Sequence, residues 1–88
     1  MTLEEVRARN DALRTTFKGG RIIMTLAVWS LPAQLRGQAL YHMSQYNAFH
    51  EDSDHSEGVF VWDEYIFYWF VGEFAEELSL TLSLAEQG

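Results

Sequence analysis

The sequence predicts an α+β fold with two helices packed on one face of a small, mainly antiparallel sheet, in the order α-β-α-β-β-β. Three observations predict this fold. Apolar residues recur at helical spacing in two segments, an aromatic-rich segment follows an acidic loop, and leucine alternates with serine and threonine near the C-terminus. Because 88 residues suffice for one small core, we expect a single domain over residues 1–88.

The first helix is predicted over residues 2–17. Thr2 and Glu5 have the spacing of a capping box, and Gly19-Gly20 can supply a left-handed end. Asn10 lies within the apolar stripe, and we expect its side chain to bond to backbone. The stripe itself consists of Leu3, Val6, Leu13 and Phe17.

A buried strand and a second helix are predicted next. The segment of residues 21–29 is too short, and too apolar on both of its faces, for a surface helix. These features are typical of a buried strand. The second helix begins around Ser30, with Pro32 in its first turn, and ends near Asn47. Gly37 weakens its middle, and close packing on the sheet is the usual reason for such a glycine. Its apolar face consists of Leu31, Leu35, Ala39, Met43 and Tyr46.

Residues 59–62 and 65–71 are predicted to form a hairpin that turns at Asp63-Glu64. A two-residue turn predicts the pairs Trp62–Tyr65, Phe60–Phe67 and Gly58–Trp69 on one face, and Val61–Ile66 and Val59–Tyr68 on the other. Asp-Glu is not a tight turn of the Asn-Gly type, so a register shifted by one residue is the alternative. Both faces carry large apolar side chains, so the pattern leaves open which face is exposed. Residues 78–84 alternate with period two, which favours a last strand over the alternative of a helix.

Charge is distributed unevenly along the chain. The net charge of −7 divides into +3 over residues 1–36, which hold all six lysines and arginines, and −10 over the remainder. Phosphate contacts need cations, so we expect no direct nucleic-acid binding. The chain lacks cysteine and an apolar run long enough to span a bilayer, and we expect no secretory signal, because no basic region followed by an apolar core is visible at the N-terminus. These features favour a soluble cytoplasmic protein with no membrane partner.

The acidic loop, residues 50–57, gathers histidines and carboxylates that could bind a metal. Begun at Asp52, it fails the EF-hand pattern, because Glu57 replaces the required glycine and Asp63 replaces the terminal glutamate. No zinc motif, nucleophile elbow or phosphate-binding loop occurs in the sequence. We therefore expect neither an enzyme nor a cofactor or metal site. A metal-binding or hydrolytic protein built on this loop remains the alternative.

Aromatic residues gather in the middle of the chain, with eleven of the thirteen between positions 41 and 74. Most of them are expected to form core, but a two-layer domain cannot easily bury both faces of residues 65–70. An aromatic face rimmed by carboxylates has the composition of a protein-recognition surface. The competing outcome is a homodimer joined through this strand.

Three stretches carry a resemblance to a known family: Arg9-Asn10-Asp11-Ala12-Leu13-Arg14, Gly19-Gly20-Arg21-Ile22-Ile23-Met24-Thr25, and Phe49-His50-Glu51-Asp52-Ser53-Asp54-His55 with Gly58-Val59-Phe60. Their order is similar to that of an uncharacterised domain-of-unknown-function family of small proteins from proteobacterial plasmids, phages and chromosomes. The chain departs from the family pattern in three respects. Its acidic loop is shorter, and the aromatic strand that follows lacks the family's lysine and aspartate. The insertion that follows this strand in the family is also missing.

The resemblance implies an association with mobile elements, whose small acidic domains are often inhibitors of host defence. We therefore expect a protein-binding module, monomeric or homodimeric, that masks a basic nucleic-acid-binding surface in the manner of an anti-CRISPR protein. A CRISPR effector subunit is the most specific candidate partner. The predicted partner-binding residues are Glu51, Asp52, Asp54, Glu57, Asp63 and Glu64, with Trp62 and Tyr65 as aromatic anchors.

Overall fold

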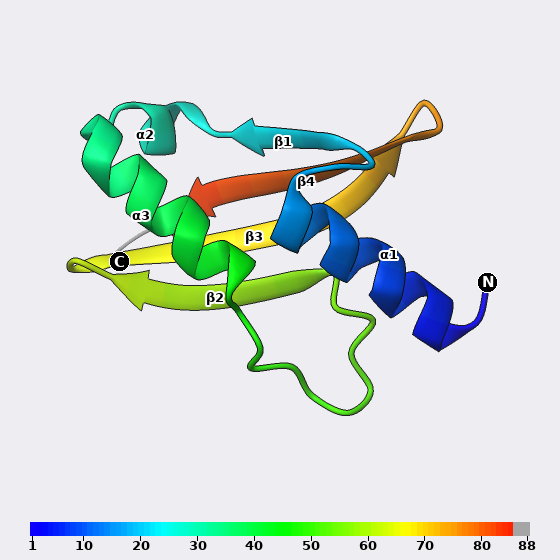
Figure 1. Cartoon of the computed structure of the whole chain (residues 1–88). Helices are drawn as coiled ribbons and strands as arrows, with labels where there is room; N and C mark the ends of the chain where they lie inside the picture. The colour runs from blue at the N-terminus through cyan, green and yellow to red at the C-terminus, as the bar shows by residue number, and fades with distance from the viewer. Residues whose placement is uncertain (86–88) are drawn as a thin grey trace.

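The computed structural model describes residues 1–85 and confirms the predicted α+β class. Its elements in chain order are α1 (Leu3–Thr16), β1 (Arg21–Met24), α2 (Leu26–Trp29), α3 (Ala33–Ser44), β2 (Glu57–Trp62), β3 (Tyr65–Phe74) and β4 (Glu77–Leu84). The strands lie in the order β1-β4-β3-β2 (Figure 1). Strand β1 runs parallel to β4, and the other neighbours are antiparallel, so the sheet is mixed.

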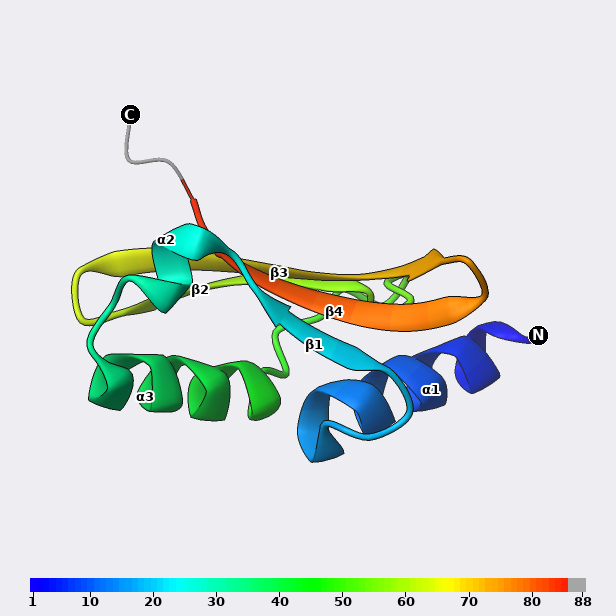
Figure 2. The ribbon, with the colours of Figure 1, turned by 90° about the horizontal axis from the view of Figure 1, so that it is seen from above.

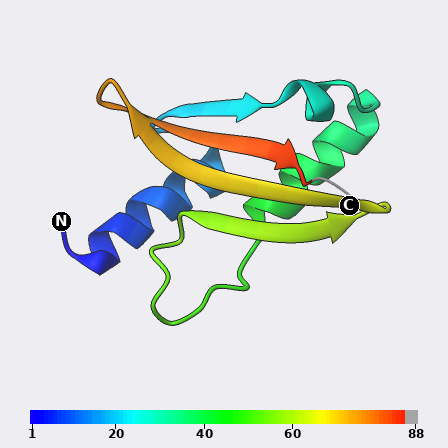
Figure 3. The same ribbon diagram turned by 180° about the vertical axis from the view of Figure 1, so that it is seen from behind.

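Helices α1 and α3 cover one face of the sheet, and within residues 1–85 no helix covers the opposite face of the β2–β3 hairpin (Figures 2 and 3). The core lies between these two layers. It is formed by Leu13, Leu35, Ala39 and Met43 from the helices and by Phe67, Trp69, Leu80 and Leu82 from the sheet. On the uncovered face Val59 and Val61 are 53% and 68% exposed. Because side chains alternate along a strand, this second hairpin face meets solvent.

Helix α1 begins with the predicted capping box. The Glu5 N–H donates to Thr2 Oγ1 (3.2 Å), and the Glu5 carboxylate accepts from the Thr2 N–H (3.3 Å). Its other end differs from the prediction, because Phe17 itself adopts the left-handed conformation (φ 60°) and its N–H donates to the Leu13 carbonyl. Phe17 therefore caps the helix and is 41% exposed, while Leu13 is fully buried.

The predicted strand over residues 21–29 is correct only as far as Met24. The Thr25 N–H still donates to the Leu82 carbonyl of β4 (3.0 Å), and the chain then enters the single turn of α2. The prediction treated these apolar residues as uniformly buried, which is wrong. Val28 is buried, whereas Leu26 and Trp29 are 82% and 54% exposed.

Helix α3 buries most of its predicted apolar face, including Leu35, Ala39 and Met43. The suggested reason for Gly37 is wrong, because this residue is exposed. A Cβ placed there would meet nothing within 4 Å, so Gly37 does not allow a close approach to the sheet.

The predicted hairpin register is confirmed at every pair between β2 and β3. Asp63 and Glu64 form the two-residue turn with φ values of 49° and 70°, and two left-handed residues in succession are typical of a type I′ turn. The last segment is a strand, as favoured, and β4 pairs antiparallel with β3. The long connection from α3 to the start of β2, residues 45–56, contains most of the acidic loop.

Candidate functional site at the acidic loop

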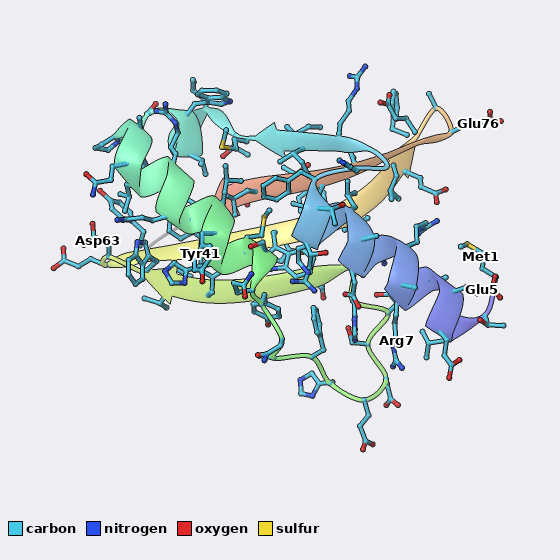
Figure 4. The ribbon with its side chains drawn as sticks, viewed as in Figure 1. Met1, Glu5, Arg7, Tyr41, Asp63 and Glu76 are labelled. Carbon is cyan, nitrogen blue, oxygen red and sulfur yellow. The ribbon has the colours of Figure 1, made fainter. Side chains whose placement is uncertain are left out.

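Side chains of α1 hold the backbone of the acidic loop. The Arg7 Nε donates to the Ser53 carbonyl (2.6 Å), and its guanidinium also donates to the Glu51 carbonyl. One turn later, the Asn10 amide donates to the Asp54 carbonyl (2.9 Å). This bond confirms the expected role of Asn10 as a residue that bonds to backbone, and the residue is only 1% exposed. Figure 4 shows Arg7 on the side of α1 next to this loop.

The end of the acidic loop is held through a second set of side chains. His55 Nδ1 lies 2.9 Å and 3.1 Å from the two carboxylate oxygens of Asp11, which in turn bonds to Arg14 (3.0 Å). The His55 ring stacks on Phe49 with centroids 3.9 Å apart and an interplanar angle of 12°. His55 therefore connects the end of the acidic loop to Asp11 of α1 and to the ring of Phe49.

Arg14 lies at the centre of this arrangement, with only 4% of the residue exposed. Its guanidinium donates to the carbonyls of Met43 (3.2 Å) and Ser44 (2.9 Å) at the end of α3, where the last carbonyls of a helix need partners from outside it. The Met43 carbonyl also accepts the Tyr46 N–H (3.2 Å). The guanidinium also lies over the rings of Phe49 and Trp69, 5.3 Å and 5.5 Å from their centroids. A buried cation therefore joins α1 to the end of α3, to Phe49 in the α3–β2 connection and to Trp69 of the sheet.

Local hydrogen bonds also shape the acidic loop. The Ser53 N–H donates to the His50 carbonyl (3.0 Å), the His55 N–H to Ser53 Oγ (2.9 Å), and the Ser56 N–H to Asp54 Oδ1 (3.1 Å). Serine and aspartate side chains commonly hold turns in this way. The loop therefore has its own turn structure in addition to its contacts with α1.

The loop carboxylates are exposed and keep their negative charge uncompensated. Within residues 1–85, no lysine, arginine or histidine forms an ion pair with Glu51, Asp52 or Asp54. Carboxylates elsewhere do have cationic partners, as in the pairs Arg9–Glu73 (2.5 Å) and Arg21–Glu77 (2.8 Å). The arginine nearest the loop, Arg7, bonds to backbone carbonyls and leaves the side chains unpaired.

An open groove of about 760 Å³ lies between this loop and the start of β2. Its lining combines apolar side chains with carboxylates and includes Tyr46, Phe49, Val59, Asp52, Asp54 and Glu57. The volume is in the range of known binding pockets. The groove contains no lysine or arginine among its described lining residues, so its potential is set by the carboxylates.

Glu57 differs from the other carboxylates of the acidic loop because it accepts a hydrogen bond from the Tyr68 hydroxyl (2.8 Å). Tyr68 lies opposite Val59 on β3, on the uncovered face. The bond to Glu57, together with partial burial and the nearby negative charge, raises the pKa of the Tyr68 phenol above its usual value.

The predicted partner-binding residues fall into three places. Glu51, Asp52, Asp54 and Glu57 lie together at the loop and the start of β2. Asp63 and Glu64 lie at the far end of β2, and Figure 4 shows Asp63 well away from Arg7. Trp62 and Tyr65 lie on the helix-covered side and are half-buried, where the Trp62 Nε1 donates to Gln38 (3.0 Å). The exposed apolar residues of β2 are instead Val59 and Val61.

The prediction from sequence does not include the polar residues of α1 that hold the loop. A signal for them exists, because Arg7, Asn10, Asp11 and Arg14 follow the spacing of one helix face. This polar face adjoins the apolar stripe and would have indicated a polar contact between α1 and another segment.

The metal-binding alternative has no convergent ligand set in the part of the chain that the structure describes. There, no three histidine, aspartate or glutamate side chains are arranged to hold an ion.

Among the described residues, no helix combines the length and apolar character needed to cross a bilayer. Comparison of the chain with protein-family models, with curated proteins and with solved structures found no match. The function must therefore be argued from the site.

Proposed function

We propose that the protein is a non-enzymatic binding module that presents the carboxylates of its acidic loop to a basic surface of a partner protein. One observation carries the proposal. The backbone of the loop is held by Arg7, Asn10 and His55, while the carboxylates of Glu51, Asp52 and Asp54 are exposed without cationic partners.

Two physical effects support binding by such a loop. Negative potential increases the rate of encounter with a positively charged partner and disfavours acidic ones. A backbone that is already ordered reduces the conformational entropy lost on association. The apolar side chains of the neighbouring groove, including Phe49 and Val59, add surface that can be removed from water.

The partner class that best fits this charge is a protein whose surface otherwise binds nucleic acid. Carboxylates held at several fixed positions can occupy cationic sites that would receive phosphates. With the association that the resemblance implies, the most specific candidate is a CRISPR effector subunit in the cytoplasm. The protein would act there as a competitor of nucleic acid.

Competition with DNA tests the proposal. Fluorescence anisotropy of labelled DNA bound to purified CRISPR effector complexes is measured as increasing amounts of the protein are added. We expect the protein to displace DNA from at least one complex, and we expect displacement to weaken as salt is raised, because salt screens exposed charges.

A double variant separates the loop from general acidity. Asp52→Lys with Asp54→Asn removes negative charge, and the amide oxygen of asparagine can still accept the Ser56 N–H. Glu4→Gln with Glu76→Lys changes the net charge equally at exposed positions outside the groove. We expect the loop variant to compete at least about tenfold more weakly, and the control to compete like the parent protein. Equal competition by the two variants would contradict the proposal.

A further inference from the structure

Strand β2 is an edge of the sheet, and its outer side is unpaired in the described part of the chain. It has one neighbour, β3, and pairs with it without interruption from Glu57 to Trp62. Within residues 1–85, none of the backbone hydrogen bonds joins the α3–β2 connection to the outer edge of β2. The edge is therefore available to another extended chain.

The register identifies which backbone groups point outward. In a two-residue hairpin the residues that flank the turn, here Trp62 and Tyr65, exchange both hydrogen bonds. Alternate residues of β2 then direct their N–H and C=O groups away from β3. These residues are Glu57, Val59 and Val61. The bond from the Val71 N–H to the Ser56 carbonyl (2.7 Å) fits the same alternation.

Strand β2 lacks the usual protection of an edge. Protected edges carry lysine, proline or a bulge, which discourage pairing with another chain. Residues 58–62 contain no charge and no proline, and the one-to-one pairing with β3 leaves no bulge. The groove beside Gly58 and Val59 provides space next to the first half of the strand.

Carboxylates flank the apolar strand at both ends. Asp54 and Glu57 lie at its start, and Asp63 and Glu64 follow its end, about 20 Å away for an extended strand. We infer that the edge of β2 receives an extended segment of the partner as an added strand, with apolar residues at its centre and lysine or arginine at both ends. This inference rests on the proposed function and specifies how the partner is bound.

The charges also argue against a second copy of the chain at this edge. Two copies of β2 paired antiparallel would place Glu57 and Asp54 of one chain beside Asp63 and Glu64 of the other. Like charges opposed across strands are destabilising. A segment with cations at its ends meets favourable charge at both ends of the strand.

Amide hydrogen exchange tests the added strand. The probe is a synthetic peptide that alternates valine with threonine and carries lysines at both ends. We expect it to slow exchange at the outward amides of Val59 and Val61 by about tenfold or more. The amides of Gly58 and Phe60, which already bond to β3, serve as an internal reference. A peptide with alternate N-methylated amides keeps the charge but cannot complete the ladder, and it should give no such slowing.

A variant of the strand provides a second measurement. Val61→Pro removes one outward N–H, and proline is tolerated where an edge N–H faces solvent. Val61→Thr retains the N–H and serves as the control. We expect the proline variant to bind the peptide roughly fivefold more weakly than the threonine variant, because one hydrogen bond is lost.

Three results would overturn the inference. If both peptides bind equally and neither slows amide exchange at Val59 and Val61, charge alone holds the peptide. The competition with DNA can succeed in that case, so this result overturns the added strand and not the proposed function. If the lysine peptide does not bind at low salt, the edge does not accept such a strand. If the two amides are protected without peptide in a manner that depends on protein concentration, a second copy occupies the edge.

Discussion

The two ends of strand β2 carry similar charge but are supported differently. At its start, the carboxylates of the acidic loop stand on a backbone that is bonded to Arg7 and Asn10 of α1. At its end, Asp63 and Glu64 form a turn with left-handed backbone angles that rests on the hairpin ladder. Negative charge in a sequence is therefore a poor guide to a binding surface until its backbone support is known.

The basic and acidic segments of the chain meet in the fold without cancelling each other's charge. The basic N-terminal segment does not neutralise the acidic loop, because Arg7 and Arg14 bond mainly to backbone carbonyls. Positive charge is used to order the loop and the end of α3, and the loop carboxylates stay free to meet an external cation. The loop therefore combines a backbone held by hydrogen bonds with carboxylates that form no ion pair within residues 1–85.

Of the substitutions proposed here, removal of the Arg14 guanidinium should lower the free energy of unfolding the most. Arg14→Met removes the side-chain donor from the Ser44 carbonyl, removes one of the donors to the Met43 carbonyl, and takes a buried cation away from Asp11. We expect the free energy of unfolding to fall by about 2–4 kcal/mol in urea titrations, since buried polar groups are costly when unpaired. Arg21→Gln, which breaks an exposed ion pair, should cost less than about 1 kcal/mol. Similar costs for both variants would show that the buried contacts of Arg14 contribute no more stability than an exposed ion pair.

The same substitution at the two ends of β2 should have opposite signs. Glu64→Gly should raise the free energy of unfolding by about 0.5–1 kcal/mol, because glycine adopts a positive φ without strain. Glu51→Gly should lower it by about 0.5 kcal/mol, because Glu51 has no positive φ and glycine adds entropy to the unfolded chain. Urea midpoints measure both changes. A shift of the same sign at both positions would contradict the backbone difference between the two ends.

The smallest expected effect concerns Tyr68 and Glu57. The pKa of Tyr68 is raised in the folded protein, so its hydrogen bond contributes stability below the unfolded pKa of about 10 and loses it as pH rises through the folded pKa. Tyr68→Phe should therefore be less stable than the parent by under about 1 kcal/mol near neutral pH. The difference should vanish at high pH. Unfolding titrations across this range check it, with Tyr41→Phe at an exposed ring as the control; a constant difference would be the contrary result.

Local patterns predicted much of the fold correctly. The structure has the register that a two-residue turn predicts for β2 and β3. Alternation alone left a shift of one residue open, because both faces of the hairpin carry large apolar side chains. The prediction failed at residues 26–29, where Leu26 and Trp29 are apolar but exposed. Their hydrophobicity carried no information about which tertiary neighbours would cover them.

The candidate site was predicted only in part. Glu51, Asp52, Asp54 and Glu57 were named together because they are close in sequence, and the fold keeps them together. Trp62 and Tyr65 were named as anchors, but the pleat of the hairpin directs them toward the helices. Which hairpin face the helices cover depends on the packing of α1 and α3, and composition does not reveal it.

Sequence pattern was sufficient for the class of fold, the capping of α1, the hairpin pairing and the segregation of charge, because each follows from neighbours along the chain. Long-range packing was needed for four further features. It placed β1 parallel to β4, joined Arg7, Asn10 and Asp11 to a loop some forty residues later, and joined Arg14 to the end of α3. Within residues 1–85 it also left one edge of the sheet open beside the carboxylates of the loop. Such contacts join distant segments, and their partners are specified only when the whole chain has folded.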